Sequence, residues 1–183
     1  MSSDRYSLAD KEGTYFLTFT VVDWIDVFTR KEHAYLICDS LNHCIAHKGL
    51  IVHAWVIMSN HMHLIARARE GHDISAIIRD FKKFTAKAIV KQIKEEPESR
   101  REWMLRHFAF RATAIERVKD FKLWEDGSHA ILLDTPLKWE QRFSYLHNNP
   151  VKGGLVAEPH HYLLSSALDY AGIKGLVNID MEW

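Results

Sequence analysis

Residues 50–68 read LIVHAWVIMSNHMHLIARA. Residues 50–58 are nearly all apolar, as in a central strand that is covered on both faces. Ser59-Asn60 is a short turn signal, because asparagine tolerates a positive φ. Residues 61–68 then return as a second strand. This stretch therefore predicts a β-hairpin at the centre of the fold.

The predicted hairpin brings His61 and His63 onto one face, because side chains alternate along a strand. With a two-residue turn, His61 lies opposite Met58 and His63 lies opposite Val56. We expect His53 on the other face, away from this pair. Two imidazoles on one face are either polar residues of a half-exposed strand or ligands of a metal ion, a common partner of buried histidines.

The rest of the chain alternates between strand-like and helix-like hydrophobic patterns. Aromatic and β-branched residues predict a first strand, and two helices begin at typical capping residues. The expected elements are a strand at 15–22, a helix at 31–48, a helix from the N-cap Asp73 to residue 94, a weakly patterned helix within 100–120, short strands at 121–124 and 129–133, and a helix from Thr135-Pro136 to about Asn149, ended by Pro150.

This order of elements predicts an α+β fold, a ferredoxin-like sandwich with a central antiparallel sheet. The length of 183 residues suits a single domain over residues 1–183. Residues 155–183 would form a C-terminal extension. Its last residues, Val177–Trp183, alternate cleanly and predict a short strand that needs a sheet edge, either its own or that of a second copy. A homodimer through this edge and a monomer both remain open.

The composition is that of a globular protein, with 47% hydrophobic and 26% charged residues. We find no apolar run long enough for a membrane span and no export signal, and we expect a cytoplasmic protein. Cys38 and Cys44 lack metal-ligand spacing and are expected to be buried, reduced thiols.

The charge balance is neutral overall but uneven along the chain. The totals are 24 basic and 24 acidic residues, which argues mildly against a nucleic-acid partner. Residues 73–94, however, carry six basic side chains against Asp73 and Asp80. This basic segment is either a solvated helix face or a track for a nucleic-acid backbone. Its members are Arg79, Lys82, Lys83, Lys87, Lys91 and Lys94.

The helix after Thr135 carries a tyrosine on its polar side. On a helical wheel, Trp139, Phe143 and Leu146 form the packed face, and Tyr145 points away from them. Asn149 lies one turn after Tyr145 on the same face. Tyr145 is either a surface tyrosine or a nucleophile. Asn149 either ends the helix or offers a hard oxygen ligand to a metal.

Several segments together resemble one family, the single-tyrosine HUH transposases of bacterial insertion sequences, and in particular the REP-associated tyrosine transposases. Order and spacing agree from about residue 12 to residue 175. Ser59 departs from the proline that is usual before the Asn-His turn. The segments that carry the resemblance are residues 54–64 (AWVIMSNHMHL), 81–87 (FKKFTAK), 145–156 (YLHNNPVKGGLV) and 165–170 (SSALDY).

The resemblance implies the ferredoxin-like fold and a role for each site residue. His61 and His63 would be metal ligands, Asn149 the third ligand, and Tyr145 the catalytic nucleophile. The implied cofactor is a divalent cation, Mg²⁺ or Mn²⁺, although two imidazoles also suit Zn²⁺. Attack by a phenolate requires positive charge nearby, which the metal, Lys138 or Arg142 would supply.

The implied function is metal-dependent cleavage and strand transfer of single-stranded DNA through a 5′-phosphotyrosine intermediate, at hairpin-containing, palindromic ends. Such a protein would be nucleoid-associated when bound to DNA. Two alternatives remain: a catalytically idle DNA-hairpin-binding protein derived from such a transposase, and an unrelated metal protein. The candidate phosphate contacts are the basic segment within residues 73–94, together with Lys138, Arg142, Arg100, Arg101 and Arg106.

Overall fold

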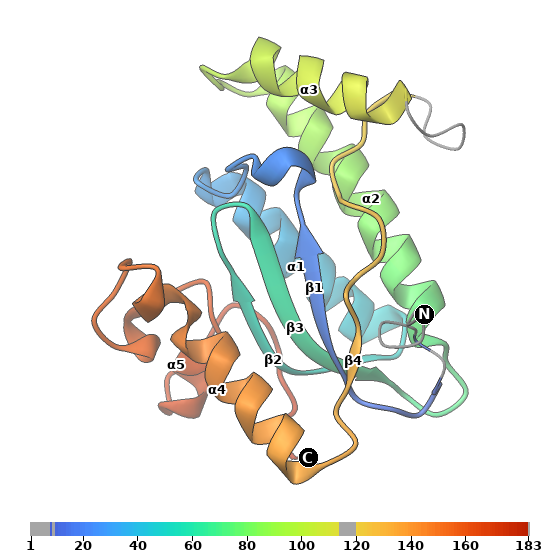
Figure 1. Ribbon diagram of the computed structural model, residues 1–183, viewed down its shortest axis with the longest axis vertical. Coiled ribbons are helices and arrows are strands. Elements are labelled where there is room, and N and C mark those ends of the chain that lie inside the picture. The colour runs from blue at the N-terminus through green and yellow to red at the C-terminus, as the bar shows by residue number, and fades with distance from the viewer. Residues whose placement is uncertain (1–7, 9, 114–119, 183) are drawn as a thin grey trace, which may run out of the picture.

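The protein is built around one four-stranded antiparallel sheet, in the order β2-β3-β1-β4 (Figure 1). The computed structural model describes residue 8 and residues 10–113 and 120–182. This sheet and its strand order confirm the predicted α+β, ferredoxin-like fold. The strands are β1 (Tyr15–Thr20), β2 (Leu50–Ile57), β3 (His61–Ala68) and β4 (Ile131–Leu132).

Helices cover both faces of the sheet (Figure 1). Helices α1 (Lys31–His47) and α2 (Ile74–Glu95) pack on one face, and α4 (Pro136–Lys152) packs on the other. The remaining helices are α3 (Arg101–Thr113), α5 (Ala167–Tyr170) and the 3₁₀ turns η2 (Val22–Trp24) and η3 (Pro159–His161).

Alternation along the strands divides the core into two clusters. In β1, Leu17 and Phe19 belong to the larger cluster beneath α1 and α2, whereas Phe16 belongs to the smaller cluster beneath α4. In β3, Met62 joins the larger cluster and Ile65 the smaller one. The odd-numbered residues of β3 therefore face α4.

The predicted hairpin register is confirmed. Val56 pairs with His63, and the amide of Met58 donates to the carbonyl oxygen of His61 at 2.8 Å. The prediction for His53 was wrong. A β-bulge falls between Val52 and Ala54, so the pairing shifts by one residue. The His53 ring consequently packs against Trp139 of α4, with a centroid separation of 5.4 Å.

Helix α4 begins as predicted but ends later. The side chain of Thr135 accepts a hydrogen bond from the amide of Lys138, and Pro136 occupies the first helical turn. The helix then continues through Pro150 to Lys152, beyond the predicted end. Pro150 has no amide hydrogen, so one carbonyl of the preceding turn lacks its helical donor. The cost is small because the helix ends two residues later.

The true end of α4 is a glycine cap. The amide of Leu155 donates to the carbonyl oxygen of Pro150 at 2.9 Å, and that of Gly154 donates to Val151 at 3.0 Å. Gly154 has φ of 70°, in the left-handed region that glycine adopts without a steric penalty. This is a Schellman motif, and it satisfies the last carbonyls of the helix that carries Tyr145.

The predicted C-terminal strand was wrong for residues 177–182, which form no strand. The segment packs on its own chain, with Val177 buried in the larger cluster. It meets β2 at the bulge, where the amide of Asp180 donates to Val52 and the Asp180 carbonyl bonds to the His53 ring. A bulged edge does not offer a regular ladder, so the pairing stays local. Trp183 lies outside the described residues.

Smaller differences concern the middle of the chain. Residues 121–124 form no strand; only Trp124 makes an isolated bridge, to Val21. Helix α3 confirms the predicted helix as far as Thr113, and residues 114–119 lie outside the described part. Cys38 and Cys44 are free and buried, as predicted. None of the helices in the described ranges is long and apolar enough to cross a membrane.

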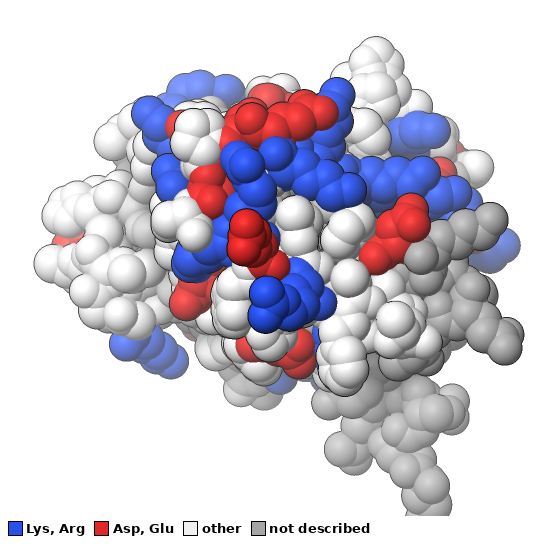
Figure 2. Space-filling view, turned by 90° about the horizontal axis from the view of Figure 1, so that it is seen from above, with Lys and Arg blue, Asp and Glu red and all other residues white. Residues whose placement is uncertain are grey.

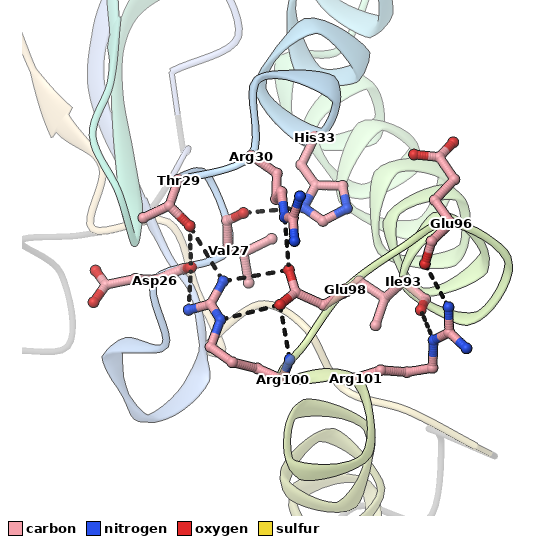
Figure 3. A network of polar contacts seen from close by, with 10 residues as sticks. All are labelled: Asp26, Val27, Thr29, Arg30, His33, Ile93, Glu96, Glu98, Arg100 and Arg101. Carbon is pink, nitrogen blue, oxygen red and sulfur yellow. Dashed lines mark hydrogen bonds and ion pairs between the residues drawn. The ribbon is translucent and has the colours of Figure 1, made fainter.

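A buried carboxylate ties the turn between α2 and α3 to the loop before α1 (Figure 3). Glu98 pairs with Arg30 at 3.3 Å and with Arg100 at 3.2 Å. Arg100 in turn donates to the carbonyl oxygen of Asp26 at 3.0 Å. Burial alone would raise the pKa of the Glu98 carboxyl, but hydrogen bonds from Arg100 and Arg30 outweigh it and lower the pKa to about 2.

Candidate functional site

The histidine pair projects from the start of β3 toward α4. The His61 and His63 rings lie 4.9 Å apart between centroids, with an interplanar angle of 70°. Met62 between them is fully buried on the other face. The predicted same-face arrangement is therefore confirmed.

Each imidazole is held through its Nδ1 atom. The hydroxyl of Thr18 lies 2.9 Å from His63 Nδ1, and the side-chain oxygen of Asn60 lies 2.8 Å from His61 Nδ1. The Asn60 amide is itself oriented, because its nitrogen donates to the Asp26 carboxylate at 3.0 Å. With Nδ1 engaged on both rings, the Nε2 atoms remain for a further partner, as in metal-binding histidines.

The environment keeps both imidazoles neutral. Burial lowers the pKa of His61. Burial, and then the charges of His61 and Arg142, lower the pKa of His63 to about 3. His63 Nε2 is buried and has no hydrogen-bond partner within the described part of the chain. A neutral imidazole with an unpartnered, buried nitrogen is suited to bind a metal ion.

The tyrosine of α4 lies beside this pair. The Tyr145 ring is 5.3 Å from the His63 ring and 6.0 Å from the Phe16 ring. Its side chain is 38% exposed, so the phenol is accessible from solvent. Trp139 and Leu146 are buried in the smaller cluster, which confirms the predicted packed face of the helix.

One cavity of about 520 Å³ unites the site. It is bounded by strand residues of β1 and β3, by the η2 turn and by α4. Asn149, one turn after Tyr145, lies on its wall together with the two histidines, so the four predicted site residues do meet. The lining residues are Phe16, Thr18, Trp24, His61, His63, His129, Ile131, Arg142, Tyr145 and Asn149.

The donor set fits a divalent cation. Two neutral imidazoles and a side-chain amide oxygen are ligand types that Mg²⁺, Mn²⁺ and Zn²⁺ accept in differing proportion. The unpartnered Nε2 of His63 is the observation that supports the fit. No cluster of three His, Cys, Asp or Glu side chains with metal-binding geometry occurs among the described residues, so an amide or water must complete any such site.

Positive charge gathers around Tyr145 from its own helix. The Arg142 guanidinium lies over the Phe16 ring at 5.4 Å, and the Lys152 ammonium lies 5.6 Å from the centre of the Tyr145 ring. Lys138 pairs with Asp134 at 2.6 Å and does not line the cavity. Of the two cations predicted on this helix, only Arg142 therefore lies at the site.

The basic segment of α2 lies on the other side of the sheet from the cavity, because α2 packs on the larger cluster. Lys82 is not available to a phosphate. Its ammonium donates to the carbonyl oxygens of Glu125 and Gly127, and burial lowers its pKa to about 8. Arg79 pairs with Asp80, whereas Lys83, Lys87 and Lys91 are exposed.

The arginines at the α2–α3 turn are also engaged within the chain. Arg100 is held by Glu98 and the Asp26 carbonyl, and Arg101 donates to the carbonyl oxygens of Ile93 and Glu96 (Figure 3). Figure 2 shows basic and acidic side chains intermixed on the face at this end of the molecule. This face is not a continuous basic surface.

Sequence reasoning missed several residues of the cavity. Thr18 pairs with His63 across the β1–β3 ladder, so the strand order would have identified it. Trp24 and His129 lie in irregular segments with positive φ, which no periodicity predicts. Lys152 does not line the cavity but lies beside the Tyr145 ring, and it was missed because the helix was expected to end before it. His147, which the sequence ranks below Asn149 as a ligand, does not line the cavity; its Nε2 lies 2.8 Å from the Ser166 hydroxyl.

Comparison with solved structures shows the same fold elsewhere. One structure, titled "Structure of the REP associates tyrosine transposase bound to a REP hairpin", matches with a TM-score of 0.64 and 20% sequence identity, over 100% of this chain and 94% of that chain. No curated protein matches the sequence significantly. The family model described as "Transposase IS200 like" matches residues 13–121, more than half of the chain. This chain therefore belongs to the family of IS200-like transposases.

Proposed function

We propose that this chain cleaves and rejoins single-stranded DNA through a covalent 5′-phosphotyrosine intermediate on Tyr145. The observation that carries the proposal is the meeting of His61, His63, Tyr145 and Asn149 in one open cavity. Membership of the transposase family supports the chemistry at a coarser level. A nucleophile that stores the phosphodiester bond energy suits strand exchange, because no external energy source is then needed.

The chain's own residues supply the parts of the reaction. The phenolic oxygen of Tyr145 attacks the scissile phosphorus, a bond forms between that oxygen and phosphorus, and the bond to the 3′-oxygen of the preceding nucleotide breaks. The phenolic proton leaves through the open mouth of the cavity, and the released 3′-oxygen takes up a proton. Arg142 adds positive charge where the attacked phosphate gains negative charge. Attack by a free 3′-hydroxyl reverses the step and joins strands.

His61, His63 and Asn149 would hold a divalent cation, either Mg²⁺ or Mn²⁺. Such a cation, when bound, polarises the scissile phosphate. Thr18 and Asn60 would then act by keeping the two imidazoles in the Nδ1–H tautomer, with Nε2 toward the cation. Zn²⁺ remains the competing choice for two imidazole ligands.

We further propose that the substrate carries a hairpin, or palindromic, end. The support is the similar fold of a transposase whose structure is titled as bound to a REP hairpin. The exposed lysines of α2, such as Lys83, Lys87 and Lys91, lie on the opposite face of the sheet from the cavity. They would contact DNA only if the duplex stem of the hairpin extended around the sheet to that face. Arg142 is the proposed phosphate contact inside the cavity.

We propose that the chain does not dimerise through the edge of β2. That edge is already occupied from within: Ile57 donates to Leu164 at 2.9 Å and Ser166 donates to Trp55 at 2.9 Å. An occupied edge cannot pair with a second copy.

An adduct assay separates the enzyme from a catalytically idle DNA-hairpin-binding protein. The wild type and a Tyr145→Phe variant are each incubated with end-labelled single-stranded DNA containing a hairpin and Mn²⁺. Tyr35→Phe is a matched control, because Tyr35 is 37% exposed and lies on α1. We expect a covalent adduct with the wild type and the control and none with Tyr145→Phe. Tight binding without an adduct would favour the idle protein.

A further inference from the structure

Trp24 is a large aromatic residue that stays exposed at the edge of the site. Its side chain is 62% exposed, yet it lies on the wall of the cavity that holds the two histidines. Its ring contacts His61 at 5.7 Å between centroids, with an interplanar angle of 69°. An indole at the mouth of a cavity offers a flat, apolar face to whatever enters.

The backbone holds this indole in place at a cost. Asp23 and Trp24 have φ values of 54° and 55°, in the left-handed region that residues with a side chain rarely adopt. Two such residues in succession persist only where the surroundings enforce them. The strained backbone therefore fixes the position of the Trp24 indole at the cavity.

Three contacts enforce the turn. From α3, Arg111 Nε lies 3.5 Å and His107 Nδ1 lies 3.8 Å from the Asp23 carboxylate. From the hairpin turn, the amide nitrogen of Asn60 donates to the carbonyl oxygen of Trp24 at 3.3 Å. The turn that presents Trp24 is thus attached both to α3 and to the residue that orients His61.

The ring contacts place Trp24 at the far end of the site from the nucleophile. Trp24 contacts His61, His61 contacts His63 at 4.9 Å, and His63 contacts Tyr145 at 5.3 Å. A phosphate at the histidines would therefore have Tyr145 on one side and Trp24 on the other. In phosphoryl transfer the attacking and leaving oxygens lie roughly in line across phosphorus. The leaving 3′-oxygen then points toward Trp24.

We infer that Trp24 is a base-stacking site for the nucleotide immediately 5′ to the cut, the one that carries the leaving 3′-oxygen. Stacking on an indole accepts any base, since every base has a π face, and single-strand binding proteins use aromatic side chains in this way. The inference rests on the proposed function and adds a consequence. Trp24 retains the released 3′-end beside the phosphotyrosine, so that the strand can be rejoined or exchanged.

The test combines protein and DNA changes. The cut site is first mapped with the wild type. Affinities for single-stranded DNA are then measured by fluorescence anisotropy in the Tyr145→Phe background, which prevents cleavage. We compare Trp24→Ala and Trp24→Phe, using DNA that is intact, abasic just 5′ to the cut or abasic just 3′ to it. Phe84→Ala is the matched control, because Phe84 is 60% exposed and lies on α2.

We expect Trp24→Ala to weaken binding of intact DNA between about 5-fold and 150-fold, the range for removal of one base–aromatic stack. Trp24→Phe should restore most of this loss, and Phe84→Ala should bind like the parent. On DNA that is abasic 5′ to the cut, Trp24→Ala and its parent should bind equally.

If Trp24→Ala lost the same affinity on intact DNA and on DNA abasic 5′ to the cut, the inference would be overturned. It would also be overturned if the effect of Trp24→Ala disappeared only on DNA abasic 3′ to the cut. Either result leaves the proposed function intact when the wild type forms its adduct. Absence of any adduct with the wild type would overturn the proposed function and the inference with it.

Discussion

The Thr18 hydroxyl lies 2.9 Å from Nδ1 of His63, on the neighbouring strand and directly opposite it in the ladder. This contact engages Nδ1 and leaves Nε2 as the ring nitrogen that a further partner could use. Nε2 of the same ring is buried and has no hydrogen-bond partner among the residues that the structure describes.

Replacing Thr18 tests this contact. Thr18→Val keeps the branched shape but removes the hydrogen bond that fixes the ring and its tautomer. Loss of such an orienting partner typically weakens metal binding about 10- to 100-fold. We expect that loss for Mn²⁺, measured by electron paramagnetic resonance titration. Thr18→Ser keeps the hydroxyl and should bind like the wild type; an unchanged affinity in Thr18→Val would show that the contact is only structural.

Asn60 is expected to play the same part for His61. Asn60→Ala removes the bond that orients the imidazole, together with the bonds of Asn60 to the Asp26 carboxylate and the Trp24 carbonyl. We expect Mn²⁺ affinity to fall about 10-fold or more. Asn148→Ala is the matched control, because that side chain bonds within α4, to the carbonyl of Ser144. Equal affinities for the two variants would argue against the role.

Buried histidines should make the metal-free protein sensitive to mild acid. Burial lowers the pKa of His147 to about 4. As the pH falls, His147 therefore becomes protonated in the unfolded chain at a higher pH than in the folded protein. Its contribution to stability is complete above the unfolded value near 6.5 and is lost as the pH falls toward 4.

The measurement is urea unfolding in EDTA at several pH values from 4 to 7. His147→Gln should flatten the dependence of the unfolding free energy on pH by about 1.4 kcal/mol per pH unit in this window. The control, His160→Gln, changes an exposed residue and should leave the slope as it is. A slope that does not respond to His147→Gln would refute the assignment.

The Glu98 network should also stabilise the fold, and its contribution should be lost at a lower pH than that of His147. The pKa of this carboxyl is lowered from 4.5 to about 2, so its contribution is complete above pH 4.5 and is lost as the pH falls toward 2. Glu98→Gln leaves Arg30 and Arg100 without their charged acceptor and should cost about 2 kcal/mol at neutral pH. Glu102→Gln, at an exposed position of α3, should cost little. Equal unfolding midpoints in urea would contradict this.

Much of the fold could be predicted because its local signals agree with one another. A two-residue turn fixes the register of the hairpin, and the alternation of β3 then places His61 and His63 on one face. Thr135-Pro136 fixes the start of α4, and the wheel from there puts Tyr145 and Asn149 on the cavity side. These residues are determined by spacing within one element, which sequence shows directly.

The errors arise where tertiary contacts override a local pattern. The bulge in β2 lies where Asp180, far away in sequence, bonds to both Val52 and His53. Lys82 reads as part of a basic stripe, but two carbonyls of the segment before β4 capture its ammonium. Trp24 has a left-handed conformation in a turn that is held by α3 through Asp23 and by Asn60. No periodicity within a single element contains this information.

If the proposed function is right, Tyr145 becomes bonded to the 5′-phosphate of cleaved DNA. The most direct measurement is tandem mass spectrometry of the adduct formed with hairpin-containing single-stranded DNA and Mn²⁺, after nuclease and protease digestion. We predict a nucleotide 5′-phosphate attached to the phenolic oxygen of Tyr145. A nucleotide attached to any other side chain, or cleavage of the DNA without an attached nucleotide, would contradict it.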